Sequence, residues 1–235
     1  GALMSYLEET QKETLKFRKI STLGQSNFMF LDTPTQRNLE LVHNLKDGST
    51  AGTLLWAMDE TLTPMGGRYL RNAVLRPLIS AGEIKKRQTA VKHLIEDYEL
   101  NEPLRNSLRK IQDIERLTQR VATGAANARD LVAIRHSLEH LPPIKKSLSG
   151  SSDVHLSGIG NSIADLADVK ELIGKAILEH PPLSLRDGGI IKSGYLPEID
   201  ELKALASNAK DYIASLEAEE KKKTGIQSLK VGYNR

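Results

Sequence analysis

Apolar residues recur at helical spacing along most of the chain, and the longest such run covers residues 197–223. Within it, the positions three and four residues apart carry apolar or small side chains, namely Ile199, Leu202, Ala206, Ala209, Ile213 and Leu216. This strict alternation is typical of a helix that packs along one narrow seam, as in a coiled coil. At about 1.5 Å per residue the run spans roughly 40 Å. We therefore predict one long helix that projects beyond a compact core.

The other helical patterns are shorter and are bounded by capping residues, glycines and prolines. They predict helices over residues 3–15, 33–46, 63–76, 80–95, 101–111, 113–123, 127–141 and 163–177. Two β-like runs, residues 17–23 and 28–31, flank a turn and predict a small hairpin near the N-terminus. The segment 147–160 is rich in serine and glycine, so we expect a flexible loop there. Residues 228–233 have the pattern of the first half of a strand.

Composition favours the same fold class, because aromatic residues make up only 4% of the chain while helix-forming residues are plentiful. The chain has no cysteine, which excludes disulfides and thiolate metal sites. No apolar run approaches the roughly 18 residues that cross a membrane, and the first residues lack a signal-peptide pattern, so the cytoplasm is the default location. A net charge of +3 does not by itself indicate a nucleic-acid-binding protein.

One short motif matches a catalytic pattern. His136, Glu139 and His140 read H-x-x-E-H, the inverted zinc-peptidase signature. The two histidines lie one helical turn apart and can bind a metal together, with Glu139 as the base. The alternative, which we prefer, is a solvated helix face near a helix C-terminus, where histidine is favourable. In that interpretation Leu138 and Leu141 make the core contact and the histidine face points outward.

A second feature is a locally basic region, formed by Arg68, Arg71, Arg76, Lys85, Lys86 and Arg87. It is a weak candidate for phosphate contacts, because aromatic residues are not interleaved with the cations and acidic residues surround them. A stand-alone helical nucleic-acid-binding module is therefore one hypothesis, and an ordinary charged surface is the other. Arg37 and Asn38, at a helix start, either contact another domain or pair locally.

Several sequence blocks together resemble one family. Leu31-Asp32 is followed by the run TQRNLEL at 35–41, TLLWAMD at 53–59, TPMGGR at 63–68 and LRPL at 75–78. Further along come DIERL at 113–117, GIIKSGY at 189–195 and LKVGYN at 229–234. In this order, and over nearly the whole chain, they are similar to the lever, or core, domain of the MutS family of DNA mismatch-repair proteins.

The resemblance implies an all-α, multi-helix lever domain with the long projecting helix and the small hairpin. Residues 1–15 would be the tail of a connector domain, 16–224 the lever domain and 225–235 the first residues of a clamp domain. We expect a fragment without the ATPase domain, hence no enzyme activity of its own and no cofactor or metal, with ATP and Mg²⁺ bound elsewhere in a full-length parent. Its expected role is structural and allosteric, coupling the ATPase domain to the DNA clamp during mismatch repair.

The resemblance also implies partners. These are mismatched duplex DNA, other domains of the same chain, a second copy in a homodimer and a MutL-type downstream protein, in the bacterial cytoplasm near the nucleoid and without a membrane. Interdomain or DNA-proximal contacts are expected at Arg37, Asn38, Arg68, Lys85, Lys86, Lys230, Asn234 and Arg235. The zinc-dependent hydrolase and the stand-alone nucleic-acid-binding module remain the alternatives.

Overall fold

A computed structural model describes residues 27–184, 186, 188–226 and 228–230, together with Tyr6 and Glu9. This part of the chain is helical and contains no strand, only two isolated antiparallel bridges, Phe28 with Leu78 and Ile177 with Ile191. The all-α prediction is therefore confirmed. The predicted hairpin is not seen: its first run, 17–23, and most of the helix predicted at 3–15 lie outside the described residues, and Phe28 in the second run pairs with Leu78 instead.

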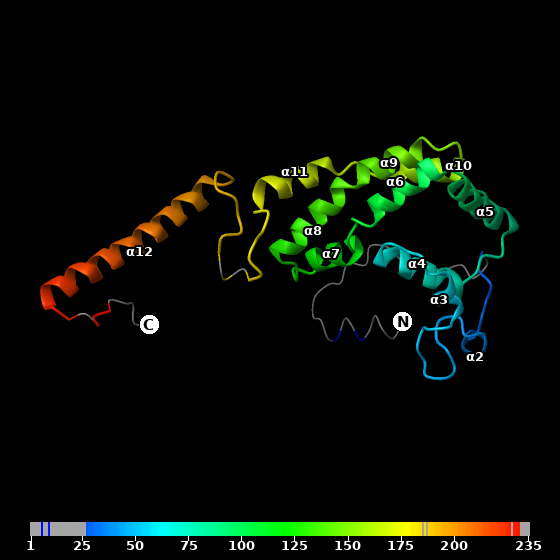
Figure 1. Cartoon of the computed structure of the whole chain (residues 1–235), viewed down its shortest axis with the longest axis horizontal. Coiled ribbons are helices and arrows are strands. Elements are labelled where there is room, and N and C mark those ends of the chain that lie inside the picture. Colours follow the sequence, from blue (N-terminus) through cyan, green and yellow to red (C-terminus); the bar gives the residue numbers. More distant parts are fainter. Residues whose placement is uncertain are drawn as a thin grey trace. The chain divides into compact units, whose positions relative to one another are not determined.

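The chain divides into two compact units. The first comprises Gly1–Thr61 and Gly67–Lys92, and the second comprises Leu62–Gly66 and His93–Arg235. Helices α2 (Thr33–Asn38), α3 (Leu54–Met58), α4 (Pro64–Leu75) and α5 (Ala81–Glu96), which Figure 1 labels, belong wholly or mainly to the first unit. Its core is the apolar cluster of Leu41, Val42, Leu55 and Val74.

Helix α2 shows how local chemistry sets an element in the first unit. Asp32 is its N-cap, since one carboxylate oxygen accepts the Thr35 N–H at 2.9 Å, and Pro34 occupies the first turn. The helix ends at Asn38, earlier than predicted, because Glu40 adopts a left-handed conformation with φ of 47°. The chain then turns, and Leu41 and Val42 become buried in the core.

The second unit holds the remaining helices: α6 (Tyr98–Leu108), α7 (Ile114–Ala122), α8 (Ala128–Glu139), α9 (Leu141–Ser149), α10 (Val154–Ser162), α11 (Ala167–Ala176) and α12 (Pro197–Thr224). Helix α8 packs against α7, α9 and α11, and α9 also packs against α6 and α10. The core cluster centres on α8, where Val132, Ile134 and Leu138 meet Ile173 and Ile177. Helix α8 is thus the hub of this unit.

The prediction of a flexible loop over residues 147–160 is wrong. Helix α9 runs to Ser149 and α10 begins at Val154, with Asp153 as its N-cap. Gly160 is not a flexible position but a packing position, because a Cβ atom there would collide with the backbone of Leu148 and Ser149. Glycine thus allows α10 to approach α9 closely.

The long helix predicted over 197–223 is present as α12, with Pro197 at its first position and Gly225 in the left-handed conformation beyond its end. Leu202 and Leu205 are each 65% exposed. The strand start predicted at 228–233 is not seen in residues 228–230, and residues 231–233 lie outside the described part.

Candidate functional site at helix α8

Helix α8 begins at a capping box. The Asn127 side chain accepts the Asp130 N–H at 3.0 Å, and the Asp130 carboxylate accepts the Asn127 N–H at 2.8 Å. Arg120 of α7 pairs with the same carboxylate at 3.1 Å, so the charge of the largely buried Asp130 is compensated. The start of the hub helix is therefore fixed both by its own sequence and by its neighbour α7.

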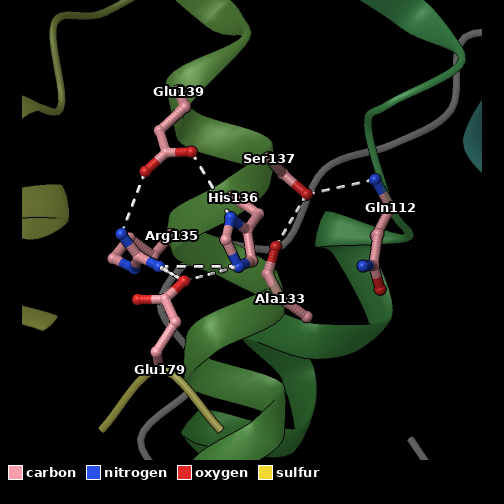
Figure 2. Close-up of polar contacts among 7 residues, drawn as sticks. All are labelled: Gln112, Ala133, Arg135, His136, Ser137, Glu139 and Glu179. Carbon is pink, nitrogen blue, oxygen red and sulfur yellow. Dashed lines mark hydrogen bonds and ion pairs between the residues drawn. The ribbon is translucent and has the colours of Figure 1, made fainter. Parts of the chain in front are cut away.

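Ser137 ties the C-terminal part of α8 to the segment before α7 (Figure 2). Its side chain is fully buried, its hydroxyl donates to the Ala133 carbonyl at 2.8 Å, and the Gln112 N–H donates to the hydroxyl at 3.0 Å. Gln112 lies outside any helix, and Ser137 supplies the acceptor for its backbone N–H. Ser137 therefore has a structural role, holding the segment before α7 against α8, and does not act as a nucleophile.

The opposite face of α8 carries an ionic cluster, which Figure 2 shows. Arg135 donates to Glu139 at 3.0 Å and also to Glu179, which follows α11 in the chain. Glu139 lies 3.3 Å from Nδ1 of His136, and Glu179 lies 3.2 Å from Nε2 of the same ring. Only 15% of the Arg135 side chain is exposed. One guanidinium thus joins two carboxylates from different segments.

The charge environment of Glu179 follows from this cluster. Loss of solvent alone would raise the pKa of its carboxyl, but the charge and hydrogen bond of Arg135, with smaller contributions from His136 and Lys192, outweigh that effect and lower the pKa. Glu179 is therefore held as a carboxylate and stays paired with Arg135 at neutral pH.

This geometry bears on the H-x-x-E-H motif. Both ring nitrogens of His136 face carboxylates, Glu139 is engaged by Arg135, and His140 is the C-cap residue of α8. In the part of the chain that the structure describes, no three such side chains are grouped so as to hold a metal ion. The predicted outward face is confirmed, with Leu138 in the core and the His136 side chain 43% exposed. The zinc-hydrolase alternative is not favoured.

The segment between α11 and α12 is attached to the hub by several further bonds. Arg129 of α8 donates to the Pro181 carbonyl at 3.0 Å. The Leu178 N–H donates to the Ile190 carbonyl and the Lys192 N–H to the Ala176 carbonyl, both at 2.9 Å. These bonds flank the bridge of Ile177 with Ile191, so two parts of the segment are paired with each other beside α8 and α11.

The first turns of α12 are attached to the same segment. Lys203 donates its ammonium N–H to the Ile191 carbonyl at 2.8 Å, and the Asp200 carboxylate accepts the Gly194 N–H at 2.6 Å. A continuous series of bonds thus runs from α8 through Glu179 and residues 190–194 to the first turns of α12, which we call the foot of α12. The run GIIKSGY at 189–195 lies at this connection.

The residues predicted for interdomain or DNA contacts are distributed as follows. Arg37 and Asn38 lie on α2 and line a pocket together with Leu45. Lys85 and Lys86 are exposed on α5, where Lys86 pairs with Glu83 at 2.6 Å. Arg68 lies on α4 and Lys230 is exposed, while Asn234 and Arg235 lie outside the described residues. Their contact roles remain predictions.

Sequence reasoning missed the residues of the ionic cluster that matter most, Arg135 and Glu179. The only local signal was the spacing of Arg135 and Glu139, four residues apart on one helix. Glu179 is 44 residues away from Arg135, and nothing in the spacing points to it.

Comparisons with known proteins agree with this architecture. The family model of MutS domain III matches residues 34–227. The DNA mismatch repair proteins MutS of Ruminiclostridium cellulolyticum, Symbiobacterium thermophilum and Alkaliphilus oremlandii are 42%, 44% and 45% identical to the chain. Each alignment covers 100% of this chain and 27% of the relative, so the chain spans about a quarter of the length of these proteins.

The chain is thus a helical module that matches about a quarter of the length of its relatives. It belongs to the MutS family and corresponds to MutS domain III, as the sequence blocks predicted. Within the described residues, no helix combines the length and the apolar character that crossing a membrane requires.

Proposed function

We propose that this chain is a mechanical module of a DNA mismatch-repair protein, which couples an ATPase domain to a DNA clamp and carries out no chemistry itself. The family membership supports the mismatch-repair setting. The observation that carries the coupling role is the series of bonds from α8 through Glu179 and residues 190–194 to the foot of α12. A long helix transmits a displacement only if its base is held firmly.

The roles of the full-length parent belong to the same proposal. The parent binds ATP and Mg²⁺ in another domain, acts on mismatched duplex DNA as a homodimer, engages a MutL-type protein, and works in the bacterial cytoplasm at the nucleoid. Arg37, Asn38, Arg68, Lys85, Lys86 and Lys230 are the described residues through which this module would meet DNA or neighbouring domains.

The test uses a full-length MutS protein that contains this domain. Replacing Arg135 and Glu179 by glutamine, singly and together, removes the link between α8 and the segment before α12. We expect basal ATPase activity to persist while its response to mismatched DNA falls. The effects of the two single substitutions on this response should not add up in the double variant, because both remove the same interaction.

Lys175→Gln is the matched control, because Lys175 pairs with Glu171 on its own helix and does not reach the cluster. Unchanged mismatch-dependent ATPase activity in the double variant, with the fold intact by circular dichroism, would refute the coupling role of this link.

A further inference from the structure

A cavity of about 490 Å³ lies in the second unit, where the end of α8 and helix α9 meet the segment leading into α11. Its walls include the apolar side chains Leu138, Leu141, Ile163 and Leu166. Sites for small organic molecules have volumes of this order and are lined mainly by apolar side chains with a few polar groups. The dimensions and the lining therefore match a small-molecule site.

The charged side chains of the lining are three lysines and one aspartate, so basic residues predominate. The lysines are Lys145 and Lys146 from α9 and Lys170 from α11. Lys170 also lies near Glu171, whose carboxyl pKa its charge helps to lower, after the larger effect of Lys175. The one acid in the lining, Asp165, already accepts the Ala167 N–H at 3.0 Å. The cavity thus presents a positive potential that favours an anionic group.

A separate observation concerns Ser149, at the end of α9, which also lines the cavity. Its hydroxyl oxygen is buried and has no hydrogen-bond partner, which is true of no other buried side-chain polar atom in the described residues. Buried hydroxyls are nearly always paired, since an unpaired one loses its bonds to water without replacement. Rotation of the Ser149 side chain toward the cavity would let the hydroxyl, which has almost no accessible surface in the free protein, bond to a ligand oxygen.

We propose that this cavity binds a small amphiphilic anion, with an aliphatic body against the leucine and isoleucine wall and a carboxylate or phosphate beside the lysines and Ser149. This goes beyond the coupling function. Carboxylates and phosphate monoesters both present an anionic headgroup, and binding of octanoate or of octyl phosphate distinguishes between them.

The experiment titrates the 235-residue chain with octanoate, octyl phosphate, octanol and octyltrimethylammonium, each below its micelle concentration, and follows the methyl NMR signals of Leu141, Ile163 and Leu166. We expect saturable shifts with at least one anion and an affinity for octanol lower by about tenfold, because octanol lacks the charge-assisted bonds. The cationic probe should bind more weakly still. The tighter of the two anions identifies the headgroup.

Variants locate the site. Replacing Lys145 and Lys170 together by glutamine should weaken anion binding by about tenfold. Lys175→Gln should leave anion binding unchanged, because Lys175 lies on the same helix as Lys170 but outside the lining. Ser149→Ala should weaken anion binding without destabilising the free protein, because its hydroxyl has no partner there. Octanol binding as tightly as both anions, or shifts spread evenly over the exposed apolar residues of the chain, would overturn the proposal.

Discussion

At the scale of single residues, Ser137 is a buried side chain that bonds α8 to the segment before α7. Ser137→Ala removes the acceptor of the Gln112 N–H and the hydroxyl's own bond to the Ala133 carbonyl, so we expect a loss of about 0.5–1.5 kcal/mol in the free energy of unfolding, measured by urea denaturation. Ser162→Ala is the matched control, because its exposed hydroxyl bonds only to the Ile159 carbonyl of its own helix. Equal effects of the two substitutions would show that the Gln112 contact contributes nothing.

Glu179 should give the protein a specific dependence on acid. Its pKa is lowered in the folded state, because Arg135, His136 and Lys192 outweigh the effect of lost solvent. The unfolded chain therefore binds the proton more readily, and the stability that this carboxylate contributes is present above about pH 5. It is lost progressively as the pH falls below the ordinary glutamate pKa of about 4.3.

The measurement compares the wild type with Glu179→Gln by urea denaturation between neutral and acidic pH. The difference in the free energy of unfolding should be constant at neutral pH and shrink on acidification. Glu219→Gln on α12, outside the cluster, serves as the control for a general change of charge. A difference that grows as the pH falls would contradict the assigned pKa direction.

Among the elements, α10 offers a matched pair of glycines. Gly160→Ala places a Cβ atom against the backbone of Leu148 and Ser149, and backbone cannot move aside as a side-chain tip does. We expect a loss of about 1–3 kcal/mol from overpacking between α9 and α10. Gly158, in the same helix, has no atom within 4 Å of its added Cβ. Gly158→Ala should therefore stabilise the protein by about 0.5–1 kcal/mol through helix propensity.

Thermal unfolding of both variants decides the matter, since the two substitutions are chemically identical and differ only in their surroundings. If Gly160→Ala were as stable as Gly158→Ala, helices α9 and α10 would not be in the close contact described.

The same elements show what the sequence can and cannot predict. The starts of several helices were predicted at the right residues, because Asp32, Thr63, Asp113 and Asn127 each bond to a backbone N–H three residues ahead. Such contacts are local and leave a local pattern. Helix α10 was missed because its glycines suggested a loop, whereas Gly160 serves a contact with another helix. The ionic cluster was missed for the same reason, since its partners are distant in sequence.

At the scale of the whole molecule, the resemblance to the MutS family identified which domain this chain corresponds to. Only the structure shows how α12 is attached. Its foot is bonded to residues 191–194, while its apolar residues Leu202, Leu205 and Tyr212 are more than 60% exposed. Hydrogen exchange should therefore divide the second unit. Amides of α8, within the apolar core, should exchange only by global unfolding, and those of the middle of α12 by local opening.

Two substitutions test this division. Ile134→Ala, in the core, should lower the free energy of unfolding by about 2–5 kcal/mol, whereas Leu202→Ala, exposed on α12, should change it by less than about 0.5 kcal/mol. In a longer parent with a helix packed along the α12 seam, Leu202→Ala should become costly, because the same side chain would then be buried. A large effect of Leu202→Ala in this chain alone, growing with protein concentration, would mean instead that a second copy already covers the seam.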